Sequence, residues 1–382
     1  MKFAHLGDCH LGGWRQPELR ALNFQYFQQA INYCLREKVE FILITGDLFD
    51  SAYPPIDSLK EAFNEFRKLK EAKIPVFLIA GSHDYSASGK TFLDVLETSG
   101  FCKNVSIFEE KNNIIYLQPT IYKNVAIYGY PGRKSGMEVQ DIARMKLQDS
   151  PGLFKILMLH TAIRDAVGTL PIPAVEENML PKIDYLALSH LHIFYTKENR
   201  AYSGPIFPNN ISELEELQSG SFCIFNNGKI KREIIALKKV SAFNLEINDA
   251  LNSTQQIISF LDQQDLLERI IILNLSGILE KGRISDVDFN KIENFARKKG
   301  AFSFLKSTTK LRHPDSEIVF EEAEANQLES LIIDQFTSKN QSKFNPSINN
   351  LLRTLQIEQM EEEKSAVFEE RLYEEIKKVI EI

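Results

Sequence analysis

The stretch Lys2-Phe3-Ala4-His5-Leu6-Gly7-Asp8-Cys9-His10 opens the chain with a short apolar run that ends in an aspartate and a histidine. Four further apolar runs follow the same scheme, at residues 41–44, 76–79, 156–159 and 185–188. Runs of this length and composition are typical of buried strands. Amphipathic helical patterns at 22–38 and 57–72 lie between the opening run, the run at 41–44 and the run at 76–79. The alternation predicts an α/β fold.

Residues that can bind a metal ion follow every one of these runs. They are Asp8-Cys9-His10, Gly46-Asp47-Leu48-Phe49-Asp50, Gly81-Ser82-His83-Asp84, His160 and His190-Leu191-His192. A single histidine after a strand is usually a hydrogen-bonded core or surface residue. Five strand ends that each supply an aspartate or a histidine are hard to explain by packing. Because ligands in open α/β sheets gather at the carboxyl ends of the strands, we expect these side chains to converge on a metal site.

The residue types of this set indicate the kind of metal. Aspartate and histidine donors without cysteine favour Mn²⁺, Fe²⁺ or Zn²⁺ over Ca²⁺ and Mg²⁺. The donors outnumber what one ion needs, and a shared carboxylate allows two ions roughly 3.5–4 Å apart. Such a pair can hold a phosphodiester and activate a water molecule. The sequence therefore predicts two divalent ions per chain.

The order of these motifs over residues 8–192 resembles that of the calcineurin-like metallophosphoesterases. The resemblance implies a two-sheet sandwich flanked by helices. It also implies a role for each matching residue: Asp8, His10 and His192 at the first ion, Asp47 as the bridge, and His160, His190 and Ser82 at the second ion. His83 would be the acid that protonates the leaving oxygen, and Asp50 would orient it.

Two positions depart from the family pattern. Ser82 stands where the family has an asparagine, whose carbonyl oxygen is a better ligand than a neutral hydroxyl. Ser189 stands where the family has a glycine before His190, which is the milder change. The first departure motivates an alternative, namely a weakly active or non-catalytic scaffold that binds DNA.

A closer resemblance is to the SbcD and meiotic-recombination-eleven nucleases. It rests on the opening Lys2 to Gly12, on Pro54-Pro55 after the second motif, and on Leu157-Met158-Leu159-His160. This family implies a Mn²⁺-dependent DNA exonuclease and endonuclease of double-strand-break repair. Its partners would be DNA ends, single-stranded DNA, an ABC-type coiled-coil ATPase (Rad-fifty or SbcC) and a second copy of the chain. A phosphatase or a cyclic-nucleotide phosphodiesterase is the alternative within the superfamily.

Four regions follow from the patterns and the resemblance. They are a nuclease domain at 1–236, a small α+β capping domain at 237–312, a helix and polar linker at 313–346, and a helix-loop-helix tail at 347–382. In the family the capping domain grips DNA and the tail binds the ATPase. The tail residues expected at that contact are Leu351, Leu352, Leu355, Phe368, Leu372 and Ile376. The alternative is a helical pair that packs on its own domain.

The net charge of -7 argues weakly against a nucleic-acid ligand, but most of the acidic excess lies after Pro314. Two bound ions would also add about four positive charges. Candidate phosphate contacts flank the motif loops and a predicted hairpin at 114–130 with its turn at 123–124: Arg15, Arg20, Lys90, Arg133 and Lys134. Each is equally explained as a solvated surface charge. Leu59 and Leu93 lie where the family's dimer helices would be, and a core position explains them equally well.

The remaining features concern the compartment. The sequence contains no apolar run of about 18 residues, so a membrane span is not expected. The N-terminus lacks the layout of a signal peptide, and the four scattered cysteines form no disulfide framework. Together with the resemblance, these features lead us to expect a cytoplasmic, nucleoid-associated protein of a prokaryote.

Overall fold

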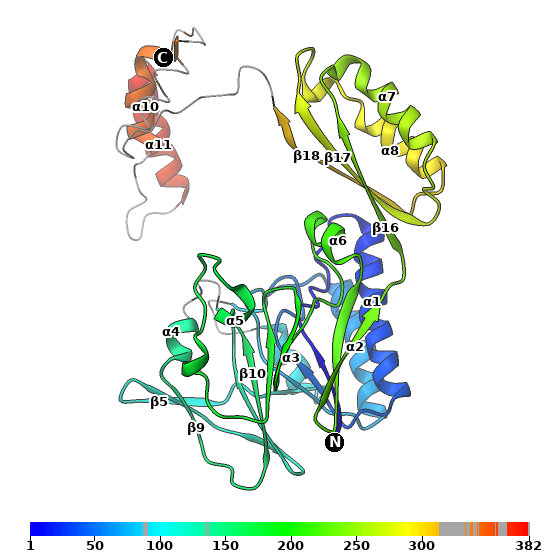
Figure 1. Ribbon diagram of the computed structural model, residues 1–382. Coiled ribbons are helices and arrows are strands. Elements are labelled where there is room, and N and C mark those ends of the chain that lie inside the picture. The colour runs from blue at the N-terminus through cyan, green and yellow to red at the C-terminus, as the bar shows by residue number, and fades with distance from the viewer. Residues whose placement is uncertain are drawn as a thin grey trace.

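Two six-stranded sheets face each other in the first 235 residues of the computed structural model (Figure 1). The structure describes residues 1–86, 91–133, 136, 138–312, 333, 337–338, 342, 344–355, 357 and 365–380. The first sheet has the order β15-β14-β1-β2-β3-β4, with β1 Lys2–Leu6, β2 Ile42–Ile44, β3 Val76–Leu78, β4 Lys103–Asn104, β14 Gly220–Asn226 and β15 Lys229–Ile235. The second has the order β12-β13-β11-β10-β8-β7, with β7 Thr120–Tyr122, β8 Val125–Tyr130, β10 Phe154–His160, β11 Tyr185–Ser189, β12 Phe194–Lys197 and β13 Arg200–Ser203. This is the two-sheet α/β sandwich that the sequence predicted.

Side chains of the first sheet alternate between its two faces, as the period of an extended strand requires. Ala4 and Leu6 of β1 point to the helices that cover the outer face. Phe3 points the other way, and its ring meets that of Tyr185 of the second sheet edge to face, with centroids 5.1 Å apart. Both faces are therefore buried, which explains why the strands read as continuous apolar runs.

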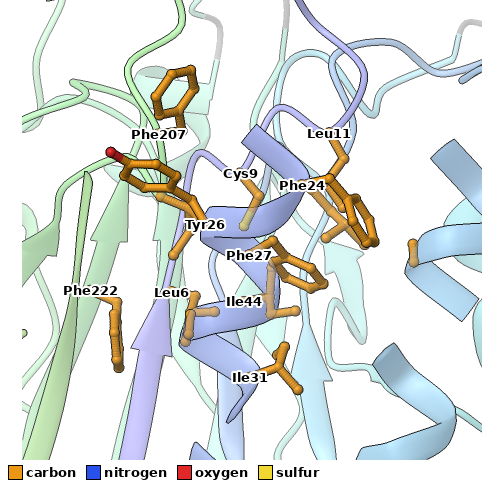
Figure 2. Packing of buried hydrophobic residues seen from close by; sticks show 14 of the residues in the cluster. Leu6, Cys9, Leu11, Phe24, Tyr26, Phe27, Ile31, Ile44, Phe207 and Phe222 are labelled. Atoms are coloured by element: carbon orange, nitrogen blue, oxygen red, sulfur yellow. The ribbon is translucent and has the colours of Figure 1, made fainter. Parts of the chain in front are cut away.

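Three helices cover the outer face of the first sheet: α1 Pro17–Arg36, α2 Ile56–Glu71 and α3 Phe92–Thr98. Figure 2 shows Phe27 and Ile31 of α1 beside Leu6 and Ile44 of the sheet. All four side chains have no exposed surface. The apolar face of the pattern at 22–38 is therefore the face of α1 that packs against the sheet.

A third, small sheet covers part of the outer face of the second sheet. It has the order β5-β6-β9, with β5 Phe108–Lys111, β6 Ile114–Leu117 and β9 Met145–Leu147. Ile115 and Leu117 of β6 pack into the same cluster as Tyr128 of β8. The predicted hairpin at 114–130 is thus correct only for β7 and β8, which pair antiparallel around the turn at 123–124. β6 pairs with β5 and β9 instead, because its apolar side chains cover the outer face of the sheet to which β8 belongs.

A second unit follows the sandwich and is built on three parallel strands. Its elements are β16 Lys239–Glu246, α7 Ala250–Asp262, β17 Arg269–Ile278, α8 Phe289–Lys298 and β18 Ser303–Arg312, with the strand order β16-β17-β18. One sheet face packs on α7 and α8. Ile270, Ile272 and Leu305 on the other face join the core that contains α1. The two units therefore share one hydrophobic cluster.

The described part of the tail forms two helices, α10 Ile348–Leu355 and α11 Ser365–Ile380, which lie side by side (Figure 1). The helix and polar linker predicted at 313–346 fall mostly outside the described residues. Among the described residues, no helix has the length and apolar character that crossing a membrane requires.

Candidate metal centre

The motif residues of the sequence lie together at the carboxyl ends of parallel strands from both large sheets. β1, β2 and β3 of the first sheet run parallel, as do β10 and β11 of the second. Short segments after these strands carry three overlapping groups whose potential ligand atoms lie within 4.8 Å of one another. The groups are Asp8-His10-His192, Asp8-Asp47-His160 and His10-Asp50-His83. The predicted convergence is therefore what the fold produces.

Two buried carboxylates form the middle of this cluster. Asp8 and Asp47 are each 1% exposed. The backbone N–H of His190 donates to both oxygens of Asp8, at 3.0 and 3.1 Å. The backbone N–H of His83 donates to Asp47 Oδ1 at 2.7 Å, while Oδ2 lies 3.2 Å from His160 Nε2 and 3.7 Å from His10 Nε2. Asp47 thus lies between the two groups of histidines, as a bridging ligand must.

Three histidines present the same nitrogen to the carboxylates. His10 Nδ1 lies 3.1 Å from Asp50 Oδ1, and His192 Nδ1 lies 2.9 Å from Glu213 Oε1. His160 Nδ1 lies 3.0 Å from the carbonyl oxygen of Thr45. A proton on each Nδ1 satisfies these acceptors and leaves each Nε2 with a free lone pair, which is the usual arrangement of metal-binding histidines.

The free nitrogens fit a cation better than they fit one another. The Nε2 atoms of His10 and His192 are 3.0 Å apart, although two unprotonated nitrogens cannot form a hydrogen bond. His160 Nε2 is buried, and with the ring proton on Nδ1 it forms no hydrogen bond among the described residues, because the atom it faces at 3.2 Å, Asp47 Oδ2, is also an acceptor. A buried polar atom without a partner costs about 1–3 kcal/mol. The donor set therefore suits divalent metal ions, which would supply the missing partner to each nitrogen.

The electrostatics of the cluster agree with this fit. Burial disfavours a charge on His160, yet Asp47 and Asp8 raise the pKa of its imidazole to about 9. Burial likewise disfavours a charge on His192, yet Asp8 and Glu213 raise its pKa to about 9. The carboxylates thus attract positive charge into the site, and metal ions compete there with protons.

The other predicted ligands lie at the edge of this cluster. The ring of His190 lies 5.1 Å from that of His160, centroid to centroid. Ser82 Oγ lies 3.4 Å from Asp47 Oδ2, within reach of a weak hydrogen bond. The short serine side chain thus contacts the carboxylate of Asp47, and its hydroxyl oxygen lies on the side of Asp47 where His160 also lies.

The predicted acid is the exposed member of the set. The His83 side chain is 46% exposed, and its ring lies 4.7 Å from that of His10, centroid to centroid. Its Nδ1 lies 2.9 Å from the carbonyl oxygen of Asp50 and 3.8 Å from that residue's carboxylate. Asp50 thus presents a carbonyl and a carboxylate oxygen to the Nδ1 side of the ring, which is the geometry that its predicted orienting role requires.

Two acidic residues of the site were given no role by the sequence. Asp84 is 1% exposed, and its carboxylate accepts the backbone N–H groups of Leu48, Phe49 and Gly81, which ties two motif loops together. Burial and the neighbouring Asp47 raise the pKa of Asp84 to about 6. The second residue, Glu213, contacts His192 from α6 (Ile211–Leu217), beyond all the motifs. The position of Asp84 after His83 was a usable signal, whereas Glu213 had none.

The backbone of the site is strained where the ligands lie. Five candidate ligands have a positive φ of 44–105°: Asp8, His10, Asp47, His190 and His192. Such values are uncommon for residues other than glycine, and each costs about 1–3 kcal/mol. Neighbouring glycines allow the loops to approach, because a Cβ on Gly132 would lie 2.5 Å from His160 Cδ2. Strain of this kind clusters at functional sites.

The candidate DNA contacts differ in their surroundings. Arg15 and Arg20 are exposed, and Arg20 Nε donates to the carbonyl oxygen of Trp14. Arg133 forms an ion pair with Asp141 at 3.1 Å, so part of its guanidinium is already engaged. Lys90 and Lys134 lie outside the described residues.

The two leucines considered for a dimer contact lie in the core of the chain. Leu59 is 8% exposed and Leu93 is 2% exposed, and both pack in the cluster beneath the helices. Their side chains contribute to packing within one chain. Exposed apolar side chains do lie nearby, at Ile56 and Val95.

Comparisons with known proteins agree with this geometry. A family model described as calcineurin-like phosphoesterase matches residues 1–194. The DNA double-strand break repair protein Mre11 of Methanosarcina acetivorans is 27% identical over 317 residues, which are 79% of this chain and 49% of that protein. The protein of the same name from Sulfolobus acidocaldarius is 32% identical over 199 residues, half of either chain.

A bacterial relative is similar over a comparable region. The uncharacterized metallophosphoesterase YhaO of Bacillus subtilis is 28% identical over 210 residues, which are 50% of this chain and 48% of that protein. The chain thus spans about half the length of the curated relatives it matches.

The contact between Gly81 and Asp47 leads to a first prediction. A Cβ on Gly81 would lie 2.2 Å from Asp47 Oδ1 and 2.4 Å from Asp47 N, so Gly81→Ala must displace the central carboxylate. We expect this variant to bind Mn²⁺ at least about tenfold more weakly, as measured by calorimetric titration. Gly152→Ala is the control for the strain of a substitution alone: Gly152 has a positive φ of 75°, which disfavours alanine, but its Cβ would meet nothing within 4 Å. Unchanged Mn²⁺ binding by folded Gly81→Ala protein would contradict the placement of Asp47.

Proposed function

The chain belongs to the calcineurin-like phosphoesterase family, and we propose that it is a two-metal DNA nuclease of double-strand-break repair. The observation that carries the proposal is the position of Asp47 between two sets of histidines, which suits a carboxylate shared by two ions. The similarity to proteins named as DNA double-strand break repair proteins Mre11 supports the choice of DNA as substrate. The proposed place of action is the nucleoid in the cytoplasm of a prokaryote.

The proposed ligand sets follow the geometry of the site and the family pattern. Asp8, His10 and His192 would hold the first ion, and Asp47 would bridge. His160, His190 and Ser82 would complete the second. Bound divalent ions would polarise the phosphodiester and lower the pKa of a water molecule that attacks the phosphorus. Mn²⁺ is the proposed metal because the resemblance to the SbcD and meiotic-recombination-eleven nucleases implies it, and the donor set, which also fits Fe²⁺ and Zn²⁺, is compatible with it.

His83 is the proposed acid for the departing oxygen. Its exposed ring can reach a substrate, and Asp50 holds its Nδ1 side through the backbone carbonyl. With Nδ1–H donated to this carbonyl, a protonated ring directs its Nε2–H outward. This proton can pass to the leaving oxygen, which then departs as an alcohol.

The second unit supports a large substrate over a small one. A phosphatase or a cyclic-nucleotide phosphodiesterase needs no extra domain of 70 or so residues beside its site. We propose that the unit spanning β16 to β18 caps bound DNA. Arg15, which is exposed shortly after the first motif, is the residue that we propose for a phosphate contact. Binding of this kind weakens with added salt and depends little on base sequence.

The tail is the proposed contact for a coiled-coil ATPase of the Rad-fifty or SbcC type. Its six candidate apolar residues keep part of their surface exposed: Leu351, Leu352, Leu355, Phe368, Leu372 and Ile376. Two helices of this length are marginal on their own. A partner that covers their apolar surface would stabilise them.

The acid role of His83 can be separated from metal binding. We expect His83→Ala to slow cleavage of a labelled linear duplex with Mn²⁺ by about 10²- to 10⁴-fold, because a proton donor is removed. Mn²⁺ binding should stay close to that of the unchanged chain. Asp47→Ala is the control and should lose both properties. Retained cleavage in His83→Ala would refute the acid role, and no cleavage by the unchanged chain would refute the nuclease proposal.

Ser82 allows the second ion to be tested. An asparagine at this position would offer a carbonyl oxygen where the serine hydroxyl now contacts Asp47. We expect Ser82→Asn to raise the number of Mn²⁺ ions bound per chain at a limiting metal concentration, and to speed duplex cleavage. Ser99→Asn, at an exposed serine directly after α3, controls for the added side chain. An unchanged ion count and rate would mean that Ser82 does not limit the second site.

Removal of residues 341–382 tests the tail. The truncated chain should lose association with a coiled-coil ATPase of this type, measured by co-purification, and should keep its Mn²⁺-dependent cleavage. The sandwich and the second unit retain their own cores without the tail. A truncated chain that still co-purifies with the ATPase would place the contact elsewhere.

A further inference from the structure

Helix α6 lies between the candidate metal centre and the second unit, and contacts both. Three consecutive residues of this helix point in three directions: Glu213, Leu214 and Glu215. We propose that α6 is a positioning element through which the second unit fixes the orientation of His192. The inference rests on the metal centre of the proposed function and is independent of which phosphoester the protein hydrolyses.

The first contact of α6 is with the candidate ligand. Glu213 Oε1 lies 2.9 Å from His192 Nδ1, and 19–20% of each side chain is exposed. A carboxylate at this distance accepts the Nδ1 proton, so it selects the tautomer whose Nε2 faces Asp8, 3.8 Å away. Carboxylates that hold metal-binding histidines in this way strengthen the binding of the ion.

Glu213 is itself held from two sides. Its Oε2 accepts the backbone N–H of Asn209 at 2.8 Å, and its backbone N–H donates to Asn210 Oδ1 at the start of the helix. The side chain of Asn209 continues to Asp50 Oδ1 at 3.2 Å, and Asp50 contacts His10. The two carboxylates that orient His10 and His192 are therefore joined through one asparagine.

The other contacts of α6 are with the second unit. Leu214 is fully buried in the cluster that also contains Ile270 and Ile272 of β17. Glu215 Oε1 accepts a hydrogen bond from the side chain of Asn274, where the pairing of β17 with β18 shifts its register. α6 also packs against β16. Because a short helix moves as one body, displacement of the second unit would be carried to Glu213.

Mn²⁺ titration of the full chain without DNA or ATPase tests the proposal. Glu213→Ala should weaken Mn²⁺ binding by about 10- to 100-fold, whereas Glu213→Gln, which keeps an acceptor oxygen, should retain most of it. Asn274→Ala and Glu215→Ala should weaken it by about 2- to 30-fold, the range of energies for coupling between sites. Glu216→Ala removes an exposed charge from the same helix and should bind Mn²⁺ like the unchanged chain.

A second readout does not require metal. In the metal-free chain, held at a pH above the pKa of about 9 at which His192 loses its second ring proton, nitrogen NMR should find the remaining proton on Nδ1. Glu213→Ala, measured with its ring likewise neutral, should shift the population toward Nε2. Unchanged Mn²⁺ binding by folded Glu213→Ala would overturn the positioning role. Unchanged binding by both Asn274→Ala and Glu215→Ala would overturn the link to the second unit. A chain that shows these effects but cuts no DNA would refute the nuclease proposal alone.

Discussion

Two carboxylates are buried where the two large sheets meet, and the conformation of the surrounding loops depends on compensating their charge. Asp8 and Asp47 are almost fully shielded from water. A buried charge without compensation costs several kcal/mol, so the surrounding chain must supply positive partners. Backbone N–H groups of His190 and His83 supply part of this compensation, and the imidazoles supply more. The loops after five strands are shaped by this requirement.

Meeting that requirement places the loops in unfavourable conformations. Left-handed backbone at five candidate ligands brings the side chains inward over a short distance. Two packed sheets and the helices behind them hold these loops in place, since strained residues persist only where their surroundings over-determine them. Asp84 adds a local tie, because one carboxylate binds backbone groups from two of the loops. Packing in the core thereby supports the chemistry of the site.

Most of the fold and the inner site could be read from sequence, because both depend on short local patterns. Apolar runs marked the strands, and the aspartates and histidines after them marked the site, since parallel strands place their carboxyl ends together. Contacts that depend on the placement of distant elements could not be read. Glu213 reaches His192 only because α6 packs beside the site, and no motif surrounds it. Arg133 looked free for phosphate, yet the fold places Asp141 beside it.

The sequence alone also could not show which of two possible packing environments an apolar residue occupies. Leu59 and Leu93 suited a dimer surface and a core equally well, and both lie in the core. β6 suited a hairpin with the next strand, but packing against the second sheet draws it into a separate sheet. In both cases a tertiary contact, which no local pattern encodes, decides the outcome.

The distribution of the site along the chain has a consequence for folding. Asp8 and the segment that donates to it, at His190, are 182 residues apart. Closing so long a loop is slow, because the chain loses conformational entropy before the contacts between its ends can form and stabilise it. The complete set of ligands therefore exists only after both sheets have formed and docked. Ions that bind this set select the finished topology over partly folded chains, and the stabilisation they give grows with the logarithm of their concentration once it exceeds the dissociation constant.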